Sequence, residues 1–148
     1  MNAIKTILVP IDFSDNSKKI LQDAVTKAGQ LNAKVMVLYV VEGLEKYAGL
    51  SIPHISLAEM EKDLVQSATK KLELFLEENM DPSVAYESKV LNGDIVENIN
   101  TCAESEGVDM IIMGTHGFKG LEKALFGSVA ERVVKTAPCP VLTINPYK

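Results

Sequence analysis

Hydrophobic positions along this chain fall into two alternating patterns, which are short unbroken runs and longer stretches with helical spacing. The short runs cover residues 5–11, 34–41, 108–113 and 141–144, and a looser alternation covers residues 84–91. Short apolar runs rich in β-branched residues are typical of strands that are buried on both faces of a parallel sheet. The pattern therefore predicts five strands, with the one at 84–91 nearer an edge.

The longer stretches recur between these runs and repeat their apolar residues every three or four positions, which predicts helices over 17–31, 56–78, 95–107 and 128–136. Ser56 with Glu59 has the spacing of a capping box, and Asp94 with Glu97 can cap the third helix in the same way. Gly107 is a typical stop signal. Residues 43–55 show no period and are expected to form a long loop.

Strands and helices alternate through the whole chain, which predicts an α/β fold in one domain, residues 1–148, with helices on both faces of a parallel sheet. Ligands of such sheets bind beyond the carboxyl ends of strands, at the point where the strand order reverses. Two segments are therefore candidates for a site. One is the turn that begins at Asp12, after the first strand, and the other is the loop that begins at Gly114.

The second loop, residues 114–128, is rich in glycine and leads from a buried strand into a helix. Glycine lets the backbone approach a ligand closely, and the free amides at a helix N-terminus attract phosphate oxygens. The loop contains no Walker P-loop. Ser128 could donate to a ligand, but Ser128 with Glu131 also has the spacing of a capping box, so a flexible loop followed by an ordinary cap is the alternative.

Charge and composition narrow the choice of partner. The net charge of −5 disfavours general nucleic-acid binding, although Lys119, Lys123 and Arg132 make the last part of the chain locally basic and suited to an anion. No apolar run is long enough to span a membrane and no secretory leader is recognisable, so we expect a cytoplasmic protein. Cys102 and Cys139 do not form a disulfide framework or a zinc pattern and are expected to be packed thiols.

The spacing Gly114-x2-Gly117-x9-Gly127-Ser128 resembles the nucleotide motif of the universal stress protein family. Three flanking blocks, residues 7–14, 109–117 and 139–144, resemble that family's first, fourth and last strands, so the similarity covers essentially the whole chain in order. Residues 43–55 have no clear match.

The resemblance implies a five-stranded, Rossmann-like fold of the adenine nucleotide alpha hydrolase-like type and, because the glycine motif is intact, ATP as the ligand. Mg²⁺ or Mn²⁺ would accompany the nucleotide, held by phosphate oxygens and water. A homodimer through the last strand, Val141 to Ile144, is also implied. The residues that the family's motif assigns to the nucleotide are Pro10, Asp12, Val40, Met113, Gly114, Gly117, Gly127, Ser128 and Val129.

Within that assignment, Pro10 would shape the first turn, Asp12 would contact the ribose or adenine side, and Val40 would meet adenine through its backbone. Met113 and Gly114 would wall the site, and the remaining residues would hold the phosphates. From the residues alone, Asp12 could instead form an Asx turn or cap the first helix. His116 could be a solvated loop histidine or a general base.

Three functions remain open at this level. The first is an ATP-binding regulatory protein that acts as a nucleotide-dependent switch in the stress response. The second is a slow ATPase or nucleotidyl transferase, for which Asp12 and His116 are the only candidate catalytic groups. The third is a ligand-free dimeric interaction module.

Overall fold

The computed structural model describes residues 2–43, 56–116 and 127–148, and its strands form one parallel sheet in the order β3-β2-β1-β4-β5. Every neighbouring pair in the sheet is parallel. The predicted α/β fold is therefore confirmed, and the strand order reverses between β1 and β4. The strands are β1 (Thr6–Ile11), β2 (Lys34–Glu42), β3 (Tyr86–Gly93), β4 (Met110–Gly114) and β5 (Val141–Ile144).

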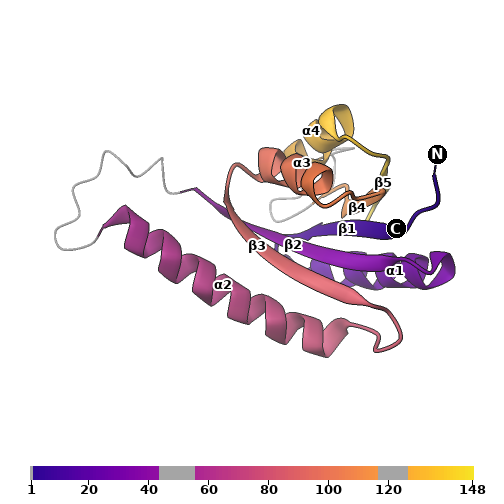
Figure 1. Cartoon of the computed structure of the whole chain (residues 1–148), viewed down its shortest axis with the longest axis horizontal. Coiled ribbons are helices and arrows are strands. Elements are labelled where there is room, and N and C mark those ends of the chain that lie inside the picture. Colours follow the sequence, from indigo (N-terminus) through magenta and orange to yellow (C-terminus); the bar gives the residue numbers. More distant parts are fainter. Residues whose placement is uncertain (1, 44–55, 117–126) are drawn as a thin grey trace.

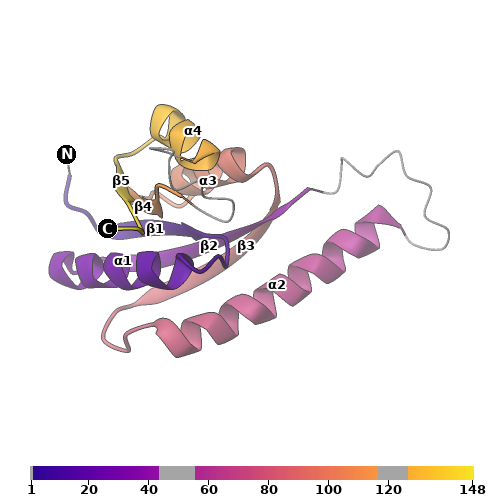
Figure 2. The ribbon, with the colours of Figure 1, turned by 180° about the vertical axis from the view of Figure 1, so that it is seen from behind.

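Helices cover both faces of this sheet (Figures 1 and 2). One face carries α1 (Ser17–Leu31) and α2 (Leu57–Asn79), and the other carries α3 (Ile95–Ser105) and α4 (Ser128–Thr136). Among the described residues, no helix is long and apolar enough to cross a bilayer.

Two hydrophobic clusters, one on each face, hold these layers together. Successive residues of a strand point to opposite faces, so Ile7 and Val9 pack toward α1 and α2 while Leu8 packs toward α3 and α4. All three side chains have 0% exposure. Burial on both faces explains why β1 is apolar at consecutive positions rather than at alternate ones.

The predicted caps are confirmed. The Ser56 hydroxyl accepts from the Glu59 amide at 3.1 Å, and the Asp94 carboxylate accepts from the Glu97 amide at 2.9 Å. Gly107 follows α3 with a φ of +62°, a left-handed conformation that glycine adopts without strain. Most of the loop predicted at 43–55 lies outside the described residues.

Two strands start two residues later than predicted. The third strand was expected at 84–91, but the Asp81 carboxylate accepts from the Ser83 amide at 2.8 Å, and the Asp81 carbonyl accepts from the Val84 amide at 3.0 Å. These bonds hold residues 81–84 in a turn, so β3 starts at Tyr86. The fourth strand starts two residues late as well, because the Val108 amide is bonded to the end of α3 (Ala103 carbonyl, 2.9 Å).

Two leucines of α2 provide a test of which face of this helix packs against the core. Leu72 is 1% exposed and packs in the core, whereas Leu74 is 54% exposed. We expect Leu72→Ala to lower the free energy of unfolding by about 2–5 kcal/mol, because it removes buried methyl groups and leaves a cavity. Leu74→Ala, the same substitution in the same helix, should change it by less than about 0.5 kcal/mol. Urea-induced unfolding measures both, and equal effects would contradict the assigned helix face.

Candidate functional site

A cavity of about 640 Å³ opens beyond the carboxyl ends of β1 and β4, where the strand order reverses. Its volume is within the range of cavities that hold small organic ligands. The described residues that line it come from five separate segments of the chain. They are Pro10, Ile11, Asp12, Ser14, Asn16, Ser17, Ile20, Tyr39, Val40, Glu42, Ile95, Ile99, Met113, Gly114, Thr115, His116, Gly127, Ser128, Val129 and Ala130.

The fold brings the predicted site residues together. Pro10, Asp12, Val40, Met113, Gly114, Gly127, Ser128 and Val129 all line this one cavity. Gly117 lies outside the described residues. Since these positions are spread over more than a hundred residues of sequence, their meeting in one cavity is a property of the parallel sheet and its strand order.

The turn after β1 is built around the Asp12 carboxylate. Its Oδ1 accepts from the Ser14 amide at 2.9 Å and from the Ser17 hydroxyl at 3.1 Å. The first bond closes an Asx turn, and the second ties Asp12 to the first residue of α1. Asp12 therefore forms the Asx turn and does not cap α1, whose N-cap is Asn16, and Asp12 also lines the cavity.

The start of α4 presents backbone amides to the same cavity. Gly127 is the N-cap and its carbonyl accepts from the Glu131 amide at 3.0 Å, the first bond within the helix. The amides of Ser128, Val129 and Ala130 precede that bond and so have no partner inside the helix. All three residues line the cavity. This end of α4 is therefore a positive site of fixed geometry.

Ser128 does not cap α4. The N-cap is Gly127, which has no side chain to accept a bond. The alternative in which Ser128 serves as an ordinary cap is therefore wrong. Its hydroxyl lies at the first helical position, beside the amides that face the cavity.

Gly127 allows close packing of the backbone and does not offer its own amide to the cavity. Its amide donates to the Thr115 carbonyl at 2.6 Å, so it is already used. A Cβ at this position would lie 3.2 Å from the same carbonyl oxygen, closer than side chains normally come to backbone. Gly127 therefore lets α4 begin directly against the end of β4.

The cavity lining brings together three kinds of group. The carboxylates of Asp12 and Glu42 lie at the ends of β1 and β2, and the amides at the start of α4 line the same cavity. Val40, Ile95, Ile99 and Met113 supply apolar side chains to its lining. A ligand with an anionic part, hydrogen-bond donors and an apolar part matches these three kinds of group.

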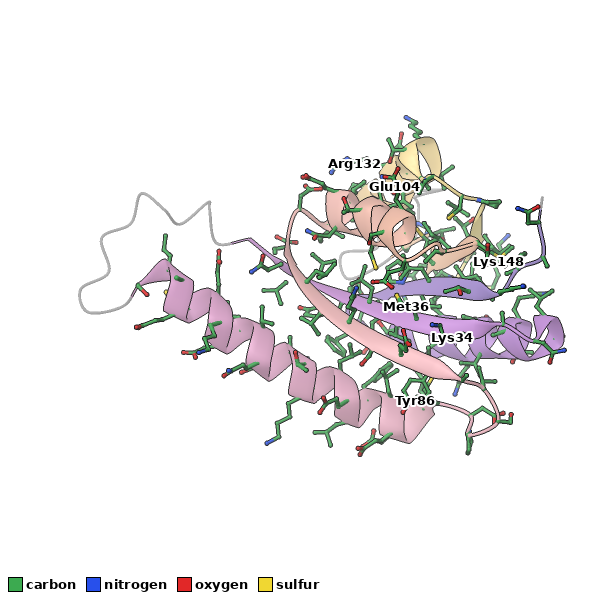
Figure 3. The ribbon with its side chains drawn as sticks, in the orientation of Figure 1. Lys34, Met36, Tyr86, Glu104, Arg132 and Lys148 are labelled. Atoms are coloured by element: carbon green, nitrogen blue, oxygen red, sulfur yellow. The ribbon has the colours of Figure 1, made fainter. Side chains whose placement is uncertain are left out.

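Arg132 does not add to the positive end, contrary to the expectation from the sequence. It reaches from α4 toward α3 (Figure 3), where its Nη2 lies 3.9 Å from the Asp94 carboxylate. It is not among the residues that line the cavity. Lys119 and Lys123 lie outside the described residues. Within the described part of the chain, backbone amides rather than basic side chains therefore make the positive end.

His116 is 3% exposed, so its interpretation as a solvated loop histidine is wrong. Its Nδ1 is 2.8 Å from the Thr115 hydroxyl, and its ring centroid is 5.5 Å from that of Tyr147, near the C-terminus. The neighbouring Thr115 amide donates to the Ile144 carbonyl of β5 at 2.9 Å. This pair therefore packs the end of β5 against the wall of the cavity.

Several lining residues were missed in the sequence. Glu42 ends β2 as Asp12 follows β1, so the strand-end rule that selected Asp12 could also have found it. Ile95 and Ile99 are the apolar positions of α3, and nothing in the pattern distinguishes a cavity wall from a core. Tyr39 lines the cavity as well, and burial raises the pKa of its phenol, with the charges of Asp12 and Glu42 raising it further.

The two cysteines lie outside the cavity lining. Cys102 is buried, and burial raises its pKa, which keeps the thiol protonated and unreactive. Burial also raises the pKa of Cys139, which is partly exposed. Among the described residues, no three His, Cys, Asp or Glu side chains gather into a metal site.

Comparison with known proteins gives a consistent result. Residues 3–145 match the model of the Universal stress protein family. Universal stress protein MJ0531 of Methanocaldococcus jannaschii is 37% identical over 149 aligned residues, which cover 99% of this chain and 85% of that protein.

Two solved structures show the same fold. That of MJ0577, from the same organism, has a TM-score of 0.81 and 30% identity, and the match covers 97% of each chain. A universal stress protein from Archaeoglobus fulgidus, solved in complex with dAMP, has a TM-score of 0.60 and 20% identity, with 97% of this chain and 100% of that chain covered.

The pKa of Tyr39 tests the electrostatics of the cavity. We expect Asp12→Asn to lower that pKa, because the substitution removes a negative charge that opposes formation of the phenolate, while burial still keeps the value above the ordinary one. Phenolate absorbance measured against pH gives the value. The chain has four tyrosines, so subtracting the titration of Tyr39→Phe isolates the signal. A Tyr39 pKa that is unchanged in Asp12→Asn would show that the two groups are not close.

Proposed function

We propose that this chain, which belongs to the universal stress protein family, binds ATP in the cavity between β1 and β4 and acts as a nucleotide-dependent regulatory protein. The observation that carries the proposal is the start of α4, where three amides without partners in the helix line the same cavity as two carboxylates. A helix N-terminus of this kind binds phosphate through its amides and its dipole.

The polarity of the cavity supports one orientation of the nucleotide. The phosphates are placed at Ser128 and Val129, because the carboxylates of Asp12 and Glu42 would repel them at the other end. The same carboxylates suit the hydroxyl groups of a ribose, which are hydrogen-bond donors. In this orientation Asp12 faces the ribose, which is one of the two contacts, ribose or adenine side, that the resemblance implies for it.

The base belongs in the apolar part of the cavity. Val40, Ile95, Ile99 and Met113 line it, and a flat heterocycle gains from burial against such side chains. Pro10 fixes the backbone at the end of β1, and Gly114 keeps the exit of β4 narrow, since a Cβ there would lie 3.1 Å from the His116 carbonyl oxygen. The dAMP bound by the Archaeoglobus fulgidus protein belongs to the same chemical class, but that likeness is one of fold, so these residues carry the argument.

A divalent cation fits this site only together with the nucleotide. Among the described residues, no three ligating side chains form a cluster, and the carboxylates that line the cavity are those of Asp12 and Glu42. Mg²⁺ or Mn²⁺ would therefore be held by phosphate oxygens and water, and would neutralise phosphate charge. The cytoplasm, where ATP is made and used, is the compartment that this proposal requires.

The regulatory part of the proposal rests on a short chain of backbone hydrogen bonds. The Gly127 amide donates to the Thr115 carbonyl, and the Thr115 amide donates to the Ile144 carbonyl of β5. The phosphate end of the cavity is therefore two peptide groups away from an edge of the sheet. Occupation of the cavity would bias the position of β5 through these bonds.

We also propose that β5 is the surface that pairs two copies of the chain. It lies at one edge of the sheet, as the dimer prediction requires, and its Leu142 is 39% exposed. An edge strand presents unpaired backbone groups that another strand can satisfy. In a homodimer formed through β5, a change in the position of β5 on nucleotide binding would also reach the second copy of the chain.

ATP binding is tested at the two residues that begin α4. We expect Gly127→Val to lower ATP affinity at least tenfold, because the new side chain pushes α4 away from the Thr115 carbonyl and misplaces its amides. Ser128→Ala should lower affinity by roughly tenfold, the value of about one hydrogen bond to a charged group. Equilibrium dialysis with labelled ATP measures both, and wild-type protein without saturable binding would refute the proposal.

The control for Ser128 uses a serine that does cap a helix. Because the Ser128 hydroxyl does not cap α4, Ser128→Ala should leave the free energy of unfolding unchanged. Ser56→Ala, which removes the cap of α2, should lower it by about 1 kcal/mol and leave ATP affinity unchanged. The opposite pattern would make Ser128 a structural residue.

The dimer is tested at the exposed face of β5. Leu142→Asp should yield monomers in sedimentation velocity, because a buried unpaired carboxylate opposes association. Leu142 is preferable to Val141, which packs against the core and would also destabilise the fold. Leu74→Asp, at an exposed leucine of α2, is the matched control and should sediment as wild type does. An unchanged dimer in Leu142→Asp would exclude β5 as the interface.

A further inference from the structure

Phe13, between Asp12 and Ser14, has a backbone conformation that its side chain does not favour. Its φ is +60°, in the left-handed region, where glycine and asparagine are common and a bulky residue is an outlier. Such a conformation persists only where the surroundings impose it. Phe13 does not line the cavity, so no direct contact with a ligand explains it.

Side chains from two other elements impose this conformation. The centroid of the Phe13 ring lies 4.7 Å from that of Tyr39 in β2 and 5.8 Å from that of Phe75 in α2. The rings of Phe13 and Phe75 pack edge to face. The Lys71 ammonium lies 4.5 Å from the centre of the Phe13 ring. Lys71 and Phe75 are one helical turn apart, so both lie on one face of α2. That face contacts the ring of Phe13, which belongs to the turn between β1 and α1.

The conformation of Phe13 determines where the Asp12 carboxylate points. Phe13 is the central residue of the Asx turn that the Asp12 Oδ1 closes with the Ser14 amide at 2.9 Å. The turn brings Oδ1 within 3.1 Å of the Ser17 hydroxyl as well. A different φ at Phe13 would reorient the Ser14 amide relative to Oδ1, so the direction of the Asp12 carboxylate depends on the conformation of Phe13.

We propose that Phe13 is the positioning residue for ribose recognition: α2 and Tyr39 hold its ring, its left-handed backbone closes the Asx turn, and the turn directs the Asp12 carboxylate into the cavity. The proposal rests on the proposed function, since it assigns a determinant of specificity within that nucleotide site. It also makes α2, which contributes no residue to the described lining of the cavity, a part of the site's specificity.

The readout is the preference for ATP over its 2′,3′-dideoxy analogue, which lacks the ribose hydroxyls. General damage to the site weakens both ligands alike, whereas a misdirected Asp12 weakens only ATP. We expect Phe13→Leu to reduce the ratio of the two affinities roughly tenfold, the factor that one hydrogen bond to a charged group contributes. Phe13→Tyr keeps the ring and should retain the wild-type ratio. Isothermal titration calorimetry measures each affinity.

Two further variants identify the route of the effect. Phe75→Leu removes the edge-to-face contact from α2 and should reduce the ratio in the same direction, and it keeps the test open if Phe13→Leu fails to fold by circular dichroism. In an Asp12→Asn background, Phe13→Leu should have no further effect on the ratio, because Phe13 acts through the Asp12 carboxylate. Leu74→Ala, an exposed neighbour on α2, is the control that should leave the ratio unchanged.

The outcomes separate this inference from the function it rests on. An unchanged ratio in folded Phe13→Leu or Phe75→Leu, or an equal loss of affinity for both ligands, would overturn the positioning role while leaving ATP binding intact. Additive effects of Phe13→Leu and Asp12→Asn on the ratio would also overturn it. Wild-type protein that binds neither ligand would refute the proposed function and this inference together.

Discussion

The structure depends on one topological constraint, which is the reversal of strand order between β1 and β4. The helix after β1, α1, packs on one face of the sheet, and the helix after β4, α4, packs on the other. The polar turn after β1 and the N-terminus of α4 therefore both line one cavity, and the first three amides of α4 have no partner within the helix. The cavity is a consequence of how the sheet is wound.

Backbone geometry rather than charged side chains gives the cavity its chemical character. Arg132 is turned toward Asp94, and among the described residues the proposed phosphate end consists of amides at the start of α4. Backbone amides in a helix have fixed positions, unlike a flexible lysine side chain, but they donate hydrogen bonds to any phosphate group. Selectivity for one nucleotide must therefore come from the rest of the cavity. Asp12, Glu42 and apolar residues of β2 and α3 line the rest of the cavity, where burial first and then the charges of Asp12 and Glu42 raise the pKa of Tyr39.

Elements that never touch the cavity still determine its geometry. On one side, α2 holds the Phe13 ring and with it the turn that carries Asp12. On the other, hydrogen bonds through Thr115 join the start of α4 to β5, and the ring of Tyr147 packs against His116. The turn that carries Asp12 is thus supported by α2, which lies beside the edge strand β3. The start of α4 is supported from the other edge of the sheet, by β5 and the C-terminal residues that follow it. A close-packed interior transmits such constraints because its side chains have few alternative positions.

The sequence by itself determined the number, type and order of the elements, because apolar periodicity and the caps at Ser56 and Asp94 act over a few residues. It also located Asp12 and the Gly127–Ser128 pair, since glycine spacing and strand ends are local signals. It did not reveal that His116 is buried, that Arg132 turns away, or that Glu42, Ile95 and Ile99 line the cavity. Nor did any local pattern mark Phe13, whose φ of +60° runs against its own preference. Those facts arise from contacts between segments far apart in the chain, which only the packing of helices on the sheet decides.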